Sequence, residues 1–207
     1  MEKPLSLTLL YTANIAGDLA LLPRLFTFLQ QLKADSRQPA LLLDLCGSCA
    51  DDVWHCRETG GRSTLMALDA MGYHAANVAG TLDDRNHEKL ADQVTLGLVD
   101  AGRDWLYRAP PVSDGSISVR LRARADAARL QIVLSSAERT AIEGNAVYLG
   151  AVGAGQVGEA LVDLQEAPTL ITARVHVMPP DTPPNPSIAG TVEFIEQEAR
   201  LLARKRE

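Results

Sequence analysis

The sequence predicts an α/β fold in which mixed β-sheet layers are flanked by helices. Its first half alternates apolar runs of strand length with segments whose apolar residues recur at helical spacing, in the order β-α-β-α-β. Its second half holds several short runs separated by turn residues, which indicates further strands. The chain has 207 residues, 46% of them hydrophobic, which suits one domain. We expect a βα half over 1–92, a strand-rich half over 93–178, and a Pro-rich connector with a closing helix over 179–207.

The first half is expected to form a parallel sheet with covering helices. The pattern predicts strands over 6–12, 40–45 and 73–78, and helices over 19–34, 62–71 and 81–91. In open α/β sheets, ligands bind beyond the carboxyl ends of the strands. We therefore expect the loops near Asn14, after Asp44 and near Gly80 to meet at one edge of the sheet.

The second half is expected to add mostly strands. Residues 116–123 alternate apolar and polar side chains, as a half-buried strand does. The sequence predicts further strands over 130–134, 146–152, 158–164 and 170–178, a hairpin around 165–169, a break at 110–115, and a closing helix over 191–204. Residues 95–100 are apolar and fit either type of element. A Gly-x-Gly-x-x-Gly match at 153–158 leads into a strand rather than a helix, so we interpret it as a tight turn.

The loop after the central strand concentrates reactive side chains. It contains all three cysteines of the chain, together with acidic residues and a histidine. Three thiolates and one imidazole are able to complete a tetrahedral zinc shell, and the candidates are Cys46, Cys49, His55 and Cys56. Cysteines at a strand end also serve as small apolar packing residues, so both interpretations stay open.

Several stretches resemble a known family. LTLLYTANIAGDL, LLLDLCGSCAD and ALDAMGYHAANVAGTLDD resemble the N-terminal half of the calcineurin-like metallophosphoesterases, in the 5′-nucleotidase and UDP-sugar hydrolase branch. Residues 145–164 are similar to the late strand, Gly-rich turn and following strand of that family. The resemblance implies a metallophosphoesterase-like fold, a pair of metal ions and hydrolysis of phosphoesters or nucleotides. The stretch between the two regions is shorter than the family needs.

The residues that carry this chemistry in the family are replaced. The metal-binding and catalytic positions of the three N-terminal motifs fall on Asn14, Ala16, Gly47, Gly80 and Thr81. Residues 134–137, Leu-Ser-Ser-Ala, occupy the place of a late Gly-His-x-His pair. A pair of metal ions needs several carboxylate and imidazole ligands. We therefore interpret the scaffold as inherited and the catalysis as lost, which makes the chain a pseudoenzyme.

The preferred hypothesis is a catalytically degenerate 5′-nucleotidase-like domain that acts as a binding or assembly module. The predicted ligand-pocket residues are Asn14, Asp44, Ser48, Asp51, Asp52, Thr81 and Asp83. A shortened parent fold would expose apolar surface, which favours a homodimer or another protein partner. A small phosphorylated ligand is a further candidate partner, and no cofactor is expected.

Two alternatives stay open. One is a divergent phosphoester or nucleotide hydrolase with zinc or manganese, in which His55 and Asp84 are the catalytic candidates beside Asn14, Asp44, Asp51 and Asp52. The other is a zinc- or thiol-binding protein built on the cysteine loop. Asp83 and Asp84 also suit a simple capping role at the start of a helix.

Charge and hydropathy exclude some classes of partner. The formal net charge of −6 argues against nucleic-acid binding, and the basic cluster Arg120, Arg122 and Arg124 is expected on the solvated face of a strand. No segment has the length of a membrane span, and no signal-peptide pattern is present. We therefore expect a cytoplasmic protein, without membrane contact, whose three cysteines stay reduced.

Overall fold

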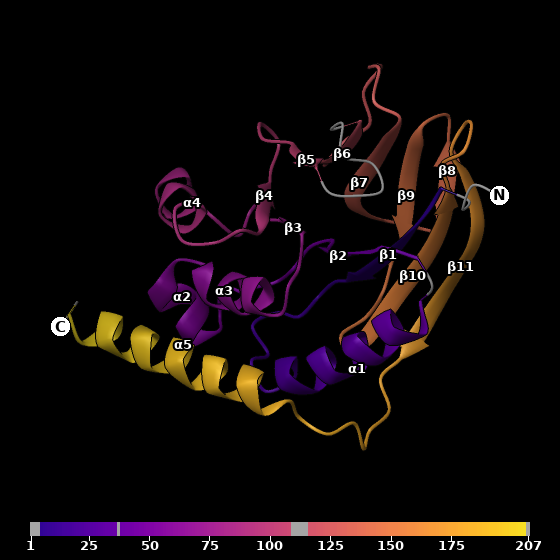
Figure 1. Ribbon diagram of the computed structural model, residues 1–207. Helices are drawn as coiled ribbons and strands as arrows, with labels where there is room; N and C mark the ends of the chain where they lie inside the picture. The colour runs from indigo at the N-terminus through magenta and orange to yellow at the C-terminus, as the bar shows by residue number, and fades with distance from the viewer. Residues whose placement is uncertain (1–4, 37, 109–115, 206–207) are drawn as a thin grey trace.

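The computed structural model describes residues 5–36, 38–108 and 116–205 and shows three layers (Figure 1). A helical layer covers one face of a six-stranded sheet, sheet A, and a five-stranded sheet, sheet B, packs on the other face. This arrangement confirms the predicted α/β class with mixed sheets. The predicted break at 110–115 lies outside the described residues.

Sheet A contains the predicted parallel core. Its strand order is β11-β10-β1-β2-β3-β4. The strands are β1 (Ser6–Thr12), β2 (Ala40–Asp44), β3 (Ala75–Asn77), β4 (Gly97–Val99), β10 (Gln156–Asp163) and β11 (Thr169–Val177). Strands β1 to β4 are parallel, whereas β10 and β11 add an antiparallel hairpin beside β1, as the sequence predicts.

Sheet B has the order β5-β6-β7-β9-β8. Its strands are β5 (Trp105–Tyr107), β6 (Ile117–Arg120), β7 (Leu130–Ala137), β8 (Ala141–Glu143) and β9 (Ala146–Gly150). The three central strands are parallel to one another, and the two short outer strands run antiparallel to their neighbours. Strands β5 and β8 lack a strong sequence signal because each has only three residues.

The helices gather on the face of sheet A that is remote from sheet B (Figure 1). They are α1 (Leu22–Asp35), α2 (Trp54–Thr59), α3 (Arg62–Ala70), α4 (Asp84–Ala91) and α5 (Pro186–Arg204). Helix α5 starts at Pro186 rather than at the predicted residue 191, because the Asn185 side chain caps the amides of Ser187 and Ile188. Among the described residues, no helix is long and apolar enough to cross a membrane.

Alternation along the strands builds two cores. On β2, Leu41, Leu43 and Leu45 at its end face sheet B, whereas Leu42 faces the helices. Because strand side chains alternate between faces, a strand buried on both sides appears as a continuous apolar run in the sequence. This burial explains why residues 40–45 give such a clear strand signal.

The outer face of sheet B is polar rather than apolar. Arg120 was expected to be solvated, but its side chain is only 6% exposed and pairs with Asp104 and Asp126. Gln131 beside it is fully buried and holds the backbone of Arg124 through two hydrogen bonds. The connection between β6 and β7 therefore packs over this face, in place of a helix, and covers the arginine that the strand pattern placed in water.

Candidate functional site

The loops that follow β1, β2 and β3 meet at one edge, as the sequence predicts. The three strands end at one level because they are in parallel register. Three backbone hydrogen bonds of 2.7–2.9 Å join residues 14–17 of the first loop to residues 46–48 of the second. Asn77, at the end of β3, donates from Nδ2 to the carbonyl oxygen of Leu45 at 2.8 Å. Direct hydrogen bonds therefore join the three loops to one another at this edge.

Asp44 does not open onto this edge. Its side chain is fully buried on the helix-facing side of β2. Its Oδ1 accepts a hydrogen bond of 3.2 Å from the Thr12 hydroxyl, which lies 3.0 Å from the Tyr73 hydroxyl, and its Oδ2 has no partner among the described residues. Burial raises the pKa of Asp44 to about 8, although the Thr12 hydrogen bond lowers it. Burial thus favours the protonated form of this carboxyl.

The other predicted pocket residues of the second loop point to different environments. Ser48 is fully buried, and its hydroxyl has no partner in the described part of the chain. Asp51 and Asp52 are both exposed in the turn before α2. Asn14 is exposed as well, and its Nδ2 donates to the Val152 carbonyl at 3.0 Å. Asn14, Asp51 and Asp52 thus reach the surface, whereas Ser48 does not.

The described contacts of Asp83 and Thr81, in the third loop, are structural. Asp83 caps α4 by accepting a hydrogen bond of 2.7 Å from the amide of Asn86, which confirms the capping interpretation. The backbone of Thr81 lies directly against Gly61, which adopts a φ of 82° between α2 and α3. A side chain at residue 61 would collide with that carbonyl, so this approach depends on glycine.

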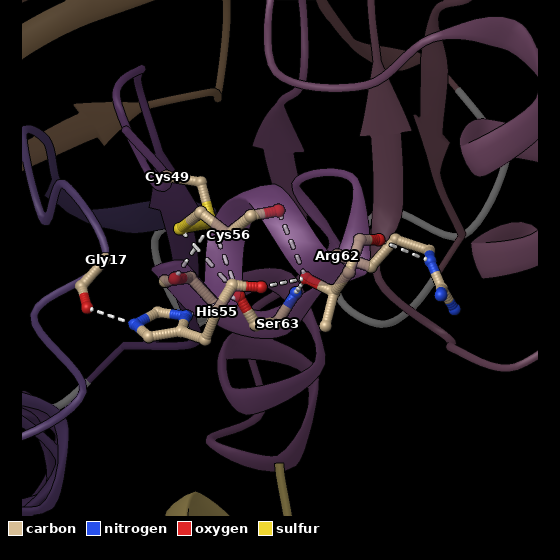
Figure 2. The surroundings of a disulfide bond; sticks show 8 residues. Gly17, Cys49, His55, Cys56, Arg62 and Ser63 are labelled. Atoms are coloured by element: carbon tan, nitrogen blue, oxygen red, sulfur yellow. Dashed lines mark hydrogen bonds between the residues drawn. A yellow bond between two sulfur atoms is a disulfide. The ribbon is translucent and has the colours of Figure 1, made fainter. Parts of the chain in front are cut away.

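The expectation that all three cysteines stay reduced is wrong, because two cysteines of the loop after β2 are bonded to each other. Cys49 and Cys56 form a disulfide (Figure 2), and Cys46 is the free cysteine. The two bonded cysteines are seven residues apart in the sequence. Their disulfide links the loop after β2 to helix α2, which was not predicted from the sequence. Disulfides persist in oxidising compartments and are rare in the cytosol. The cytoplasmic location remains a prediction, and this bond weakens its rationale.

His55 is a buried connector rather than an open ligand. Figure 2 shows its ring between Gly17 and Ser63. Nδ1 lies 2.8 Å from the Ser63 hydroxyl, and Nε2 lies 2.9 Å from the Gly17 carbonyl oxygen. Both ring nitrogens are thus engaged, with Nε2 as the donor to the carbonyl. His55 therefore joins the loop after β1 to α3.

The predicted zinc shell is not assembled. Two of its sulfurs are bonded to each other, the histidine is occupied, and the thiol of Cys46 lies 3.7 Å from the Ser136 hydroxyl on the opposite sheet. In the described residues, no three His, Cys, Asp or Glu side chains are placed to hold one metal ion. The donor set therefore fits neither the zinc site nor the rearranged metal site considered for a hydrolase.

Asp84 lies in an open pocket of about 530 Å³ beyond the ends of β3 and β4. The pocket is lined by Ala79, Gly80, Leu82, Asp84, Asp100, Ala101, Gly102 and Arg103. Arg103 contacts Asp100 at 2.6 Å and Asp84 at 3.4 Å. Burial of Asp100 acts to raise its pKa, but hydrogen bonds from the Gly102 amide and Arg103 bring the pKa below its ordinary value. The pocket thus holds an ion-pair cluster in which Arg103 contacts both Asp84 and Asp100.

Sequence reasoning missed the residue that joins the two sheets at this edge. Asn77 donates from Nδ2 to the carbonyls of Leu45 in the second loop and Leu134 in β7, at 2.8 Å each. Its Oδ1 accepts from the amide of Ala79. An asparagine near the end of a buried strand was the available signal, since such a side chain must find partners there.

Comparisons with known proteins agree with this architecture. No protein-family model and no curated protein sequence matches the chain. The calcineurin-like phosphoesterase YfkN from Bacillus subtilis superposes with a TM-score of 0.65 at 10% identity, over 99% of this chain and 100% of that structure. A 5′-nucleotidase precursor from Thermus thermophilus gives a TM-score of 0.66 at 12% identity, over 95% of this chain and 59% of that structure. The NAD nucleotidase NadN from Haemophilus influenzae gives a TM-score of 0.53 at 9% identity, over 99% of this chain and 60% of that structure.

The chain thus spans about three fifths of the two nucleotidase structures and the whole of the phosphoesterase structure. At these identities the likeness concerns the fold alone. The resemblance found in the sequence is confirmed at that level, because the superpositions cover 95–99% of this chain. The chain has the fold of the calcineurin-like phosphoesterases.

Proposed function

We propose that this chain is a non-catalytic binding or assembly module built on the phosphoesterase fold. One observation carries the proposal: the edge beyond β1, β2 and β3 has Asn14, Gly47 and Thr81 where the resemblance calls for catalytic groups. A hydrolytic site of this kind needs ligands that hold metal ions and activate water. Both ring nitrogens of His55 are engaged, and in the described residues no three His, Cys, Asp or Glu side chains are placed to hold one metal ion.

A small phosphorylated molecule is the ligand class to test at the pocket beside Arg103. The guanidinium is able to bind a phosphate through paired hydrogen bonds. In the free protein it is held by Asp84 and Asp100, so binding an anion would have to displace at least one of these contacts. Because the carboxylates of Asp84 and Asp100 already neutralise Arg103, we expect a phosphate to bind weakly here. An assembly role through another surface does not require this competition.

Elemental analysis and a hydrolysis assay test the proposal together. The untagged protein, purified without chelator, is analysed for zinc, manganese and iron and then incubated with bis-p-nitrophenyl phosphate and nucleoside monophosphates in the presence of Mn²⁺. We expect substoichiometric metal and no turnover above a buffer control. Asp84→Ala is the more informative variant: this side chain is 92% exposed, so its removal leaves the core intact and a loss of turnover would not reflect unfolding. Turnover that Asp84→Ala or His55→Ala abolishes would overturn the proposal in favour of a divergent hydrolase.

A further inference from the structure

The two sulfurs of the disulfide differ in their access to solvent. Cys49 is half-buried in the turn that follows β2, whereas Cys56 on α2 is only 3% exposed. A disulfide is reduced when a thiolate attacks one of its sulfurs and expels the other, and access decides which sulfur is attacked. A thiolate that approaches from solvent therefore reaches Cys49 and expels Cys56.

The surroundings of Cys49 stabilise negative charge on its sulfur. Its Sγ lies 3.2 Å from the hydroxyl of Thr64, in the first turn of α3. A disulfide sulfur carries no proton, so this hydroxyl is the donor. Helix α3 begins after Gly61, without a side-chain cap and without an acidic residue in its first turn. Once the bond breaks, the hydroxyl and the positive end of the helix would together stabilise the Cys49 thiolate.

Cys56 has weaker support and is enclosed. The hydroxyl of Ser63 lies 3.8 Å from its Sγ, but this hydroxyl donates to Nδ1 of His55, because Nε2 of the ring is the donor to the Gly17 carbonyl (Figure 2). A Cβ added at Gly17 would lie 2.9 Å from the Cys56 sulfur. Cys56 thus lies between α3 and the loop after β1, where it suits the role of a resolving thiol rather than an entry point.

The free cysteine of the chain does not take part in this exchange. The Sγ of Cys46 lies 3.7 Å from the Ser136 hydroxyl of sheet B, and its side chain packs on the core between the sheets. Cys49 instead contacts α3, in the opposite layer. Backbone hydrogen bonds also fix residues 46–48 to residues 14–17. The attacking thiol must therefore come from another molecule.

We propose that the Cys49–Cys56 disulfide is a reversible exchange site for an external dithiol, with Cys49 as the attacked sulfur. One thiolate of the dithiol bonds to Cys49, and the bond to Cys56 breaks with its electron pair left on Cys56. The second thiolate of the dithiol then attacks the first sulfur of the dithiol and expels Cys49 as a thiolate. The dithiol loses two electrons and becomes a disulfide, the protein gains both electrons, and the two protons of the dithiol pass through water to the cysteines.

Charge favours a dithiol over an acidic monothiol such as glutathione. Asp51 and Asp52 are exposed in the turn between the two cysteines, and the formal net charge of the chain is −6. These carboxylates repel an anionic thiol. A dithiol also releases itself from Cys49 without a second molecule having to enter the same turn.

The exchange would control how firmly α2 is attached. This helix has six residues, too few for stability by itself. Its Trp54 ring lies under Arg200 of α5, with 5.9 Å between the guanidinium carbon and the ring centroid. Reduction removes the covalent link between α2 and the loop after β2, so the state of the dithiol sets the rigidity of this edge. The inference goes beyond the proposed binding role and does not depend on it.

The unequal roles of the two sulfurs are tested in proteins with one cysteine. Cys46→Ser with Cys56→Ser leaves only Cys49, and Cys46→Ser with Cys49→Ser leaves only Cys56. At pH 7, with circular dichroism confirming the fold of both, we expect Cys49 to react with 5,5′-dithiobis(2-nitrobenzoate) at least about 10-fold faster. Equal rates, or a faster Cys56, would overturn the inference.

The part played by α3 has its own matched pair of variants. In the protein that keeps only Cys49, Thr64→Val preserves the shape of the side chain and removes the hydroxyl, and we expect the reaction to slow about 3-fold or more. Thr64→Ser retains the hydroxyl and is expected to retain the rate. A Thr64→Val protein that reacts as fast as its parent would contradict the stabilisation of the thiolate.

Native-state reduction distinguishes an exchange site from a purely structural disulfide. The Cys46→Ser protein is titrated with dithiothreitol, and its thiols are counted by the gel shift of a maleimide-polyethylene glycol adduct. We expect both thiols to appear while the circular dichroism signal stays native, and the bond to re-form once the dithiothreitol is removed in air. Glutathione at equal thiol concentration is expected to react about 3-fold or more slowly. A bond that is reduced only where the protein unfolds, or glutathione that reacts as fast as dithiothreitol, would refute the proposal. Hydrolytic turnover would overturn the non-catalytic function and leave the exchange site standing.

Discussion

Replacement of Asp44 by asparagine is expected to stabilise the protein at alkaline pH. The carboxyl is fully buried, its Oδ1 accepts one hydrogen bond from Thr12, and its Oδ2 has no partner in the described part of the chain. Asparagine keeps the acceptor at Oδ1 and does not titrate. The substitution therefore removes the ionisable group and changes the shape of the side chain little.

The magnitude follows from linkage between protonation and folding. Burial raises the pKa of Asp44 from 3.8 to about 8. Because the folded pKa is the higher one, the folded state takes up a proton between these values, and stability falls as pH rises from about 4 to about 8. At about 1.4 kcal/mol per pKa unit, the wild type should lose about 4 kcal/mol relative to Asp44→Asn between pH 5 and pH 8.

Urea unfolding of both proteins at pH 5 and pH 8, followed by circular dichroism, measures this difference. The comparison with Asp44→Asn is needed because His74 changes the stability of the wild type with pH in the opposite direction. Burial lowers the pKa of His74, so its contribution to stability grows as pH rises toward the unfolded value of 6.5. The variant retains His74, which cancels from the difference. A stability difference between the two proteins that stays the same at pH 5 and pH 8 would refute the reasoning, and would mean that folding does not raise the pKa of the carboxyl.

Three further substitutions test the construction of the edge. Cys49→Ser should lower the free energy of unfolding by about 2 kcal/mol under non-reducing conditions, the effect expected of a short closed loop; adding dithiothreitol to the wild type should reproduce it, and Cys46→Ser should not. Asn77→Ala should cost about 1–3 kcal/mol in chemical denaturation, because it leaves buried carbonyls without donors, and an unchanged unfolding midpoint would show that water replaces the side chain. Gly158→Ala should cost at least about 1–3 kcal/mol through overpacking, since a methyl group there meets the ring of Tyr11; a thermal melt equal to that of the wild type would contradict this contact.

Much of the fold could be predicted because local patterns agree with it. Strand β1 occupies Ser6–Thr12 as expected, and β2 ends at Asp44, one residue before the predicted end. The turn expected over 153–158 is shorter, because β10 already begins at Gln156. Gly158 lies within that strand and gives space to the Tyr11 ring of β1. Helix α2 was missed because its six residues are too few to show a helical period.

The candidate site was less predictable, because side-chain direction depends on packing across the sheet. Asp44 was assigned to a pocket from its position at a strand end. In the structure, strand alternation turns it toward the helices, where it meets Tyr73 from a distant segment. Cys49 and Cys56 were assigned to metal binding or packing, and their pairing required the fold of the loop around α2.

By itself the sequence determined the α/β class, the parallel arrangement of the first strands and the meeting of their loops, since each depends on residue identity and periodicity. Only the tertiary structure decided which side chains share an environment. It buried Arg120 under the β6–β7 connection, engaged both nitrogens of His55, and left β11 open at the edge of sheet A. These outcomes depend on contacts between residues far apart in the chain, and a local pattern does not encode them.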